Sequence, residues 1–274
     1  MAGFRTEDPT TGEIVRTWDA MSEEQVEDAL AAAQDAFTTW RSTDPVRRAE
    51  VLRRTADLLA QHADELADIA AEEMGKPLAQ GVGEAQLCSQ IFRYYADNAQ
   101  QLLADDALPA HGANSTRVEK EPLGVLLGVM PWNYPYYQLA RFIAPNLLLG
   151  NTLLLKPASI CAASALRLEE LLTEAGLPEG VYQTLLVGSD RIDGIIADPR
   201  VQGVSLTGSE RAGRSAHSWA RVSMPRSSTS RTSRAVVSGE EVLRPASTTV
   251  WAAACAAAAV SAGSGRVPPC ASMA

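Results

Sequence analysis

Residues 125–156 read VLLGVMPWNYPYYQLARFIAPNLLLGNTLLLK, and this stretch determines the fold expected for the chain. Two short apolar runs, at 125–129 and 152–155, flank a segment at 135–148 that is long enough for a helix. Buried runs of this length, separated by a helix, are typical of β-α-β units with parallel strands. The stretch therefore predicts two parallel strands joined by a helix.

The same alternation continues toward the C-terminus. Further strands are predicted at 184–187 and 201–206, helices at 162–175 and 192–197, and a last helix that opens at Ser209. The predicted fold class is α/β, with a Rossmann-like parallel sheet preceded by a helical N-terminal segment. Ligands of such sheets bind outside the carboxyl ends of the strands, so the residues that follow each strand form the candidate site.

The N-terminal third is predicted to be helical and structural. Ser22, with Gln25 three residues later, has the signature of a capping box, and Asp44 is an N-cap followed by proline. A single second helix is expected to end at Gly75, and a third covers about 84–103. The apolar stripe of the second helix consists of Leu52, Ala56, Leu59, Ala63, Leu66 and Ala70.

The net charge and composition of the chain argue against several classes of partner. The chain has 274 residues and a net charge of −9, whereas nucleic acids and anionic membranes favour basic patches. Its first residues contain no apolar core of signal-peptide length, so a cytoplasmic location is expected. The four cysteines (Cys88, Cys161, Cys255 and Cys270) form no CxxC pair, which favours free thiols and gives no support for a metal site.

Residues 221–274 differ in composition from the rest of the chain. They contain six Arg and two Glu but no Asp or Lys, so they carry +4, which leaves −13 on the first 220 residues. They also contain 12 Ala and 10 Ser. Such a segment buries little apolar surface, which predicts disorder. We therefore expect a cofactor-binding part at 4–220 and a low-complexity tail at 221–274.

A tryptophan, several polar residues and several glycines follow the four predicted strands. In chain order they are Trp132 and Asn133, then Lys156, then Gly188, then Gly208 and Ser209. Because the last pair opens a helix, its free backbone N–H groups would face the crevice and suit a phosphate. Each residue alone is most often a turn, core or solvated position, and residues 188–194 (GSDRIDG) do not match the dinucleotide fingerprint. Their shared edge is what favours a nucleotide site.

Four motifs in this region give a specific resemblance. PWN-x-P, L-K-P-A, G-L-P-x-G-V and T-G-S occur in one order over residues 131–209. In order and spacing they resemble the NAD(P)-dependent aldehyde dehydrogenase superfamily, and within it the succinate-semialdehyde dehydrogenase group. The resemblance extends over about residues 4–214. It implies a small-molecule aldehyde substrate, oxidised to the carboxylic acid.

The resemblance also implies roles for individual residues. Asn133 would be the oxyanion-hole amide, which donates to the aldehyde oxygen as that oxygen gains negative charge. Trp132 would lie with the cofactor-binding residues, and Lys156 would hold the adenine ribose. Gly188 would lie close to the adenosine. Gly208 and Ser209 would contact the pyrophosphate.

Ser159 bears on the choice between NAD and NADP. The resemblance places it where NAD-preferring relatives often carry glutamate, whose carboxylate accepts the ribose 2′-OH and repels a 2′-phosphate. Serine removes that repulsion. The expected cofactor is therefore NADP, with NAD as the alternative.

The chain departs from the family pattern after about Arg214. The E-L-G-G motif of the general-base glutamate and the G-Q-x-C motif of the nucleophilic cysteine are both absent, and Glu240 and Glu241 lie in SGEEVL. The Ala, Ser, Arg and Pro bias that follows resembles a GC-rich gene read out of frame. We therefore expect a truncated or frameshifted product that lacks the catalytic domain and the family's homo-oligomerisation.

Three interpretations follow. The first is a family member that lacks the catalytic thiol and base and oxidises no aldehyde. The second is a non-catalytic dinucleotide-binding or regulatory fragment. The third is an active enzyme that uses Cys161 or Cys255, although neither cysteine has the family's sequence setting.

Overall fold

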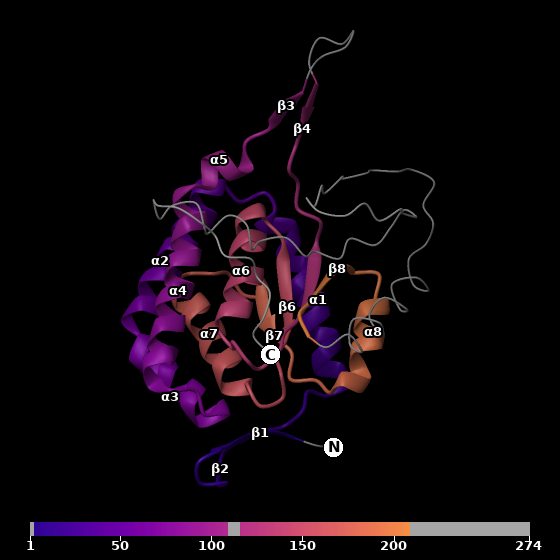
Figure 1. Cartoon of the computed structure of the whole chain (residues 1–274). Coiled ribbons are helices and arrows are strands. Elements are labelled where there is room, and N and C mark those ends of the chain that lie inside the picture. The colour runs from indigo at the N-terminus through magenta and orange to yellow at the C-terminus, as the bar shows by residue number, and fades with distance from the viewer. Residues whose placement is uncertain (1–2, 109–115, 209–274) are drawn as a thin grey trace, which may run out of the picture.

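A parallel sheet of four strands forms the centre of the molecule (Figure 1). The computed structural model describes residues 3–108 and 116–208. The sheet comprises β5 (Val125–Val129), β6 (Thr152–Lys156), β7 (Tyr182–Thr184) and β8 (Val201–Leu206), in the order β7-β6-β5-β8. Each neighbouring pair is parallel. After β7 the chain returns across the sheet to β8, on the other side of β5, and this reversal is where ligands of such sheets bind.

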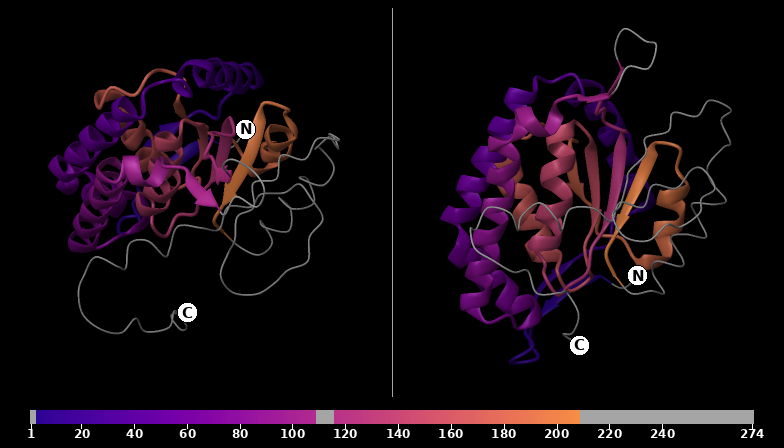
Figure 2. Two further views of the ribbon diagram at one scale, coloured as in Figure 1. Left: turned by 90° about the horizontal axis from the view of Figure 1, so that it is seen from above. Right: turned by 45° about the horizontal axis from the view of Figure 1, so that its top comes forward.

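Helices cover both faces of this sheet (Figures 1 and 2). On one face lie α6 (Tyr137–Leu149) and α7 (Ala162–Glu174), and on the other lie α1 (Glu23–Trp40) and α8 (Ile192–Ala197). The alternation of side chains along the strands explains the two cores. Leu126 of β5 packs into the α6–α7 core, and its neighbour Leu127 packs into the α1–α8 core. The predicted α/β class with a Rossmann-like sheet is confirmed.

The close packing of α6 on β5 depends on one glycine. A Cβ added to Gly128 would lie 2.6 Å from Cε1 of Phe142 on α6. Only a residue without a side chain allows the helix to come this near the strand. Gly128 therefore sets the distance between β5 and the helix that follows it.

Two predicted helix starts are confirmed. The Ser22 side chain accepts from Gln25 N–H at 3.1 Å, and the Gln25 side chain accepts from Ser22 N–H at 2.8 Å. The Asp44 side chain caps α2 (Pro45–Gln61), where it accepts from Val46 N–H. In both places the sequence contains the whole cap within a few residues.

The predicted second and third helices are each divided, which corrects the sequence-based boundaries. α2 ends before His62, and α3 (Ala63–Met74) follows at once. In the same way α4 (Leu78–Asp97) and α5 (Ala99–Leu103) meet at Asn98, and α4 begins six residues before the predicted start at Glu84. His62 and Asn98 leave helical geometry for a single residue, so the spacing of the apolar stripe continues across each break.

The third strand is shorter and earlier than predicted. It was expected at 184–187, whereas β7 pairs with β6 only over Tyr182–Thr184. Leu185 N–H still donates to Leu155 O at 2.6 Å. Val187 N–H then donates to Leu185 O, a local turn that takes the chain off the ladder. The apolar run continues past the strand because Leu185 and Val187 fill the α1–α8 core.

Two antiparallel ribbons were not predicted. β1 (Phe4–Glu7) pairs with β2 (Ile14–Trp18), and β3 (Asp106–Leu108) pairs with β4 (Thr116–Val118). The β3–β4 ribbon projects from the body of the molecule in Figure 1. All residues of β3 and β4 are exposed, so neither strand has the buried apolar run that revealed the central sheet.

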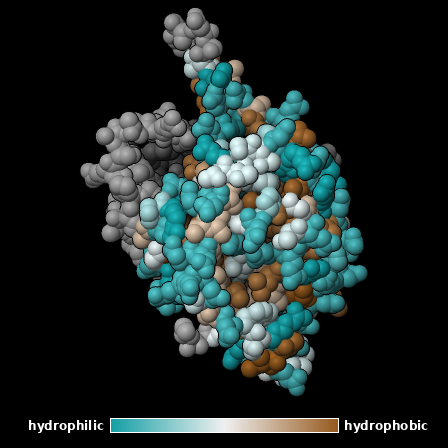
Figure 3. Space-filling model, turned by 180° about the vertical axis from the view of Figure 1, so that it is seen from behind, coloured by the Kyte–Doolittle hydropathy of each residue, from teal (hydrophilic) through white to brown (hydrophobic). Residues whose placement is uncertain are grey.

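The surface is mostly hydrophilic on the face opposite to that of Figure 1, with hydrophobic side chains in small groups (Figure 3). No helix in the described ranges is long and apolar enough to cross a membrane. The helix expected to open at Ser209 and the tail at 221–274 lie outside the described residues.

Candidate site at the carboxyl edge of the sheet

The structure brings three predicted strand ends together. Val129 of β5 pairs with Lys156 of β6 on one side and with Leu206 of β8 on the other. Beyond these pairs, Met130 N–H donates to Lys156 O at 3.1 Å, and Thr207 N–H donates to Val129 O at 3.0 Å. Lys156, the segment after β5 and Gly208 therefore share one edge of the sheet.

Residues 131–137, which we call the corner, connect β5 to α6. Trp132 is 53% exposed and Asn133 is also exposed. The segment is anchored in the protein interior on both sides. Met130, which precedes it, is buried, and Tyr136, near its end, is fully buried. The corner thus has anchored ends and presents an indole and an amide at the carboxyl edge.

Hydrogen bonds from other elements fix the backbone of the corner. The Cys161 thiol, at the start of α7, donates to Trp132 O at 3.7 Å. Glu84 of α4 accepts from Tyr136 N–H at 2.9 Å and from Tyr137 N–H at 2.8 Å. The backbone of the corner is therefore held from two helices, α4 and α7.

Lys156 is a buried cation at the same edge. All of β6 is buried, and Lys156 itself is 9% exposed. Burial lowers the pKa of its ammonium group. Within residues 3–108 and 116–208 no carboxylate forms an ion pair with it. A ligand that brings hydroxyl or phosphate oxygens would satisfy this group.

Ser159 lies in the exposed turn between β6 and α7. Cys161 N–H donates to Ala158 O at 2.9 Å and closes this turn. Ser159 follows Lys156 by three residues, in the turn that leaves the carboxyl end of β6. The turn itself carries no carboxylate.

Gly188 follows β7 and Gly208 follows β8, and the two differ in their exposure. Gly188 is half-buried and precedes a short helical turn at Ser189–Arg191. A Cβ added to Gly188 would collide with Oδ1 of Asp190. Gly208 is exposed after β8, and Ser209 lies outside the described residues. Of the two residues expected to contact the pyrophosphate, the structure therefore describes only Gly208.

The two described cysteines are buried thiols. Cys88 is 1% exposed and Cys161 is 2% exposed. Burial raises the pKa of both thiols, and the carboxylates of Glu84 and, for Cys161, also Glu73 raise it further. A nucleophilic cysteine needs the opposite, a pKa lowered toward neutrality. Cys255, Cys270, Glu240 and Glu241 lie outside the described residues.

Comparison with known proteins decides the family. The sequence model of the aldehyde dehydrogenase family matches residues 2–233. The chain belongs to the aldehyde dehydrogenase family. The match runs past Arg214, where the motif-based resemblance was expected to end.

Within the aldehyde dehydrogenases, the similar proteins include succinate-semialdehyde dehydrogenases (NADP+). One from Mycobacterium avium is 47% identical over 213 residues, which cover 77% of this chain and 45% of the relative. Another from Deinococcus radiodurans is 43% identical over 212 residues, 77% of this chain and 44% of the relative. The chain thus spans about half the length of the curated relatives it matches.

Solved structures agree with this placement. The succinic semialdehyde dehydrogenase of Streptococcus pyogenes, in complex with NADP+, superposes with a TM-score of 0.77 at 39% sequence identity. The match covers 80% of this chain and 48% of that one. The described residues therefore have the architecture of the corresponding half of an aldehyde dehydrogenase.

Sequence reasoning missed two residues of the site. Glu84 is the first residue of the predicted third helix and Lys76 directly follows Gly75, the predicted end of the second, and the sequence indicated no role for either at the corner. Both are almost fully buried, and they form an ion pair. The available signal was a carboxylate four residues before Cys88, on the apolar face of its helix, because buried carboxylates require a partner.

Proposed function

We propose that residues 3–208 form the dinucleotide-binding half of an NADP-dependent aldehyde dehydrogenase and bind NADP(H) at the carboxyl edge of the sheet. The observation that carries this proposal is Lys156, a buried cation without a carboxylate partner among the described residues, beside the exposed corner. The relatives described above are succinate-semialdehyde dehydrogenases (NADP+), which supports the same cofactor.

Each residue of the edge has a role in this proposal. Lys156 donates from its ammonium group to the adenine ribose and its substituents. Gly188 lets the adenosine approach the backbone. Gly208, together with Ser209, contacts the pyrophosphate, and Trp132 lies beside the cofactor. When bound, the nicotinamide supplies a hydride acceptor.

The preference for NADP rests on Ser159. Its hydroxyl, in the exposed turn after Lys156, donates to a 2′-phosphate or to a 2′-hydroxyl alike. A glutamate at this position would repel the phosphate at short range. Lys156 adds a favourable charge, so the pair favours the phosphorylated ribose.

The reaction class follows from the family, with an aldehyde, proposed to be succinate semialdehyde, as the substrate. Asn133 would donate its amide N–H to the aldehyde oxygen as that oxygen becomes an alkoxide. This chain supplies no matching nucleophile in the described part, since Cys161 is buried and its pKa is raised. We therefore propose that the chain binds the dinucleotide but oxidises no aldehyde and has lost the family's homo-oligomerisation.

The sequence after Arg214 supports a frameshifted gene as the origin of this state. The family's E-L-G-G and G-Q-x-C motifs are absent from the whole chain. Sequencing the gene tests this directly. We expect a shifted frame downstream of the Arg214 codon to encode both motifs, and shifted frames without them would refute the frameshift.

Titration with NADPH and NADH tests the proposed function. Isothermal titration calorimetry of the full chain should give saturable NADPH binding and weaker NADH binding. Absence of saturable binding to either would refute the proposal and the alternative of a non-catalytic dinucleotide-binding or regulatory fragment alike. Turnover of succinate semialdehyde with NADP+ that is lost in Cys161→Ala or Cys255→Ala would instead favour the active-enzyme interpretation.

A further inference from the structure

The first turn of α6 is capped from another helix. Glu84 of α4 is 4% exposed, and its Oε1 accepts from the N–H groups of Tyr136 and Tyr137 at 2.9 and 2.8 Å. These N–H groups have no partner within their own helix. A carboxylate at this end of a helix is stabilised by the helix dipole as well as by the two hydrogen bonds.

Lys76 connects this cap to the exposed part of the corner. Its ammonium group forms an ion pair with Oε2 of Glu84, and both side chains are almost fully buried. The same nitrogen lies 4.2 Å from the centroid of the Tyr134 ring, and Tyr134 is itself half-exposed. Tyr134 directly follows Asn133. The buried pair therefore contacts the corner immediately after Asn133 and again two residues later.

We propose that Glu84 and Lys76 are positioning residues for the site. Together they hold residues 134–137 so that the exposed Asn133 amide keeps one direction at the carboxyl edge. This inference rests on the proposed function, because Asn133 needs a fixed direction only if the site binds a ligand. The predicted orientation of Asn133 can nevertheless be measured in ligand-free protein. Neither residue touches the proposed cofactor or substrate, so both act through the corner.

Burial of the Lys76–Glu84 ion pair has a large desolvation cost, which packing alone does not explain. Two charges taken out of water are often replaced by apolar residues without loss of stability, whereas removal of one partner leaves the other charged and unpaired. A role in fixing one conformation accounts for retaining the pair. Loss of Glu84 would release both N–H groups of α6 and the cation beneath Tyr134.

The test compares two Glu→Gln variants in the full chain. E84Q weakens the cap of α6. The matched control E169Q alters a carboxylate of α7 that likewise accepts a backbone N–H, from Thr184 at 2.9 Å, but on β7, two strands away from β5. The first readout is the side-chain amide signal of Asn133 in ¹⁵N-labelled, ligand-free protein, assigned with N133D. The second is NADPH affinity.

We expect E84Q to shift or broaden the Asn133 signal and to weaken NADPH binding by about tenfold, because a displaced corner also moves Trp132 away from its place beside the cofactor. E169Q should leave both unchanged. An unchanged Asn133 signal in E84Q, or equal changes in E84Q and E169Q, would overturn the proposal. If the unmodified chain binds no NADPH, the proposed function fails while the ligand-free signal still decides this inference.

A second variant covers the case in which E84Q does not fold. Tyr134 is half-exposed, so Y134L removes the ring above Lys76 at little cost in stability. The Asn133 signal should move in Y134L as well. A signal identical to that of the unmodified chain would overturn the proposal.

Discussion

Lys156 and Val129 are the last paired residues of β6 and β5, and Lys156 O accepts a hydrogen bond from Met130 N–H. This pairing places the buried cation of one strand beside the start of the corner on the next. Lys156 and Val129 lie 27 residues apart in the sequence and meet only because the strands are parallel and in register.

Removal of the Lys156 cation should weaken cofactor binding. We expect K156A to raise the dissociation constant for NADPH by about 10- to 100-fold, since a hydrogen bond to a charged group contributes about 1.5–3 kcal/mol. Calorimetric titration measures the change. K120A, which removes a partly exposed lysine near the β3–β4 ribbon, is the control and should bind normally. Equal affinities of K156A and K120A would contradict the assignment of Lys156.

A charge at position 159 should change the cofactor preference. S159E places a carboxylate in the turn after Lys156, and we expect NADPH affinity to fall at least about tenfold while NADH affinity is kept or increased. S159Q has similar size without the charge and separates electrostatics from bulk. Retained NADPH preference in S159E would show that Ser159 lies away from the 2′ position.

The packing of α6 on β5 should be sensitive to a single methyl group. G128A places a Cβ 2.6 Å from Phe142 Cε1, so it should destabilise the protein by about 1–3 kcal/mol through overpacking. Chemical denaturation measures the loss. G83A is the control, because an added Cβ there meets no atom within 4 Å and Ala favours a helix by about 0.5–1 kcal/mol. The two variants should differ in sign, and a neutral G128A would contradict the packing argument.

Stability should depend on pH through Glu73, whose carboxylate caps α7 at Ala163 and Ser164. Burial raises the pKa of Glu73 from 4.5 to about 7, although hydrogen bonds from Ser164 oppose the shift. The folded state therefore binds the proton more tightly than the unfolded state. This contribution is complete below pH 4.5 and is lost as the pH rises through 7.

The expected loss over that interval is about 3 kcal/mol, at about 1.4 kcal/mol for each pKa unit. Urea denaturation between pH 4.5 and 8 measures the free energy of unfolding over the whole interval. E73Q should show a flatter dependence on pH than the unmodified chain. The pKa of Glu169 is also raised by burial, so some slope remains in E73Q. Identical slopes in the two proteins would refute the titration of Glu73.

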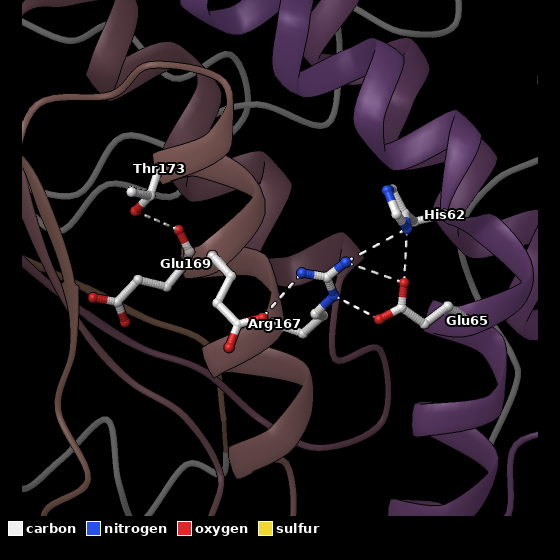
Figure 4. Close-up of polar contacts among 6 residues, drawn as sticks. His62, Glu65, Arg167, Glu169 and Thr173 are labelled. Atoms are coloured by element: carbon white, nitrogen blue, oxygen red, sulfur yellow. Dashed lines mark hydrogen bonds and ion pairs between the residues drawn. The ribbon is translucent and has the colours of Figure 1, made fainter.

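Arg167 should contribute to the contact between α3 and α7 (Figure 4). Its Nε and Nη2 bind the two oxygens of Glu65 at 2.7 and 3.1 Å, and Nη1 binds Glu170 at 2.9 Å. His62 Nδ1 also contacts Glu65, at 2.7 Å. We expect R167M to lower the free energy of unfolding by about 1–2 kcal/mol, because this bidentate pair is partly shielded.

The control for R167M is R47M, which removes the pair between Arg47 and Glu50 on the surface of α2. Arg47 is 70% exposed, so this pair should contribute less than about 0.5 kcal/mol. Urea denaturation at low and high salt compares the two variants. Equal losses would show that the network of Figure 4 is no stronger than a surface pair.

Local sequence was sufficient for much of the fold and for the composition of the site. Ser22 and Gln25 contain a complete cap within four residues, and the apolar runs at 125–129 and 201–206 became strands with those bounds. Asn133 and Lys156 were placed at strand ends because polar residues directly follow buried runs. In each case the interacting groups are close in the chain or repeat with a fixed period.

Tertiary contacts decided the rest. The end of β7 at Thr184 depends on where its hydrogen bonds to β6 stop, and the roles of Glu84 and Lys76 depend on α6, about 50 residues away. A buried carboxylate and a buried ammonium group have no preferred partner in the sequence itself. The amino-acid sequence thus determined which groups reach the carboxyl edge of the sheet. The packing of α4 against α6 determined how the corner that presents Asn133 is held, because it brings the unpaired N–H groups of α6 to the Glu84 carboxylate of α4.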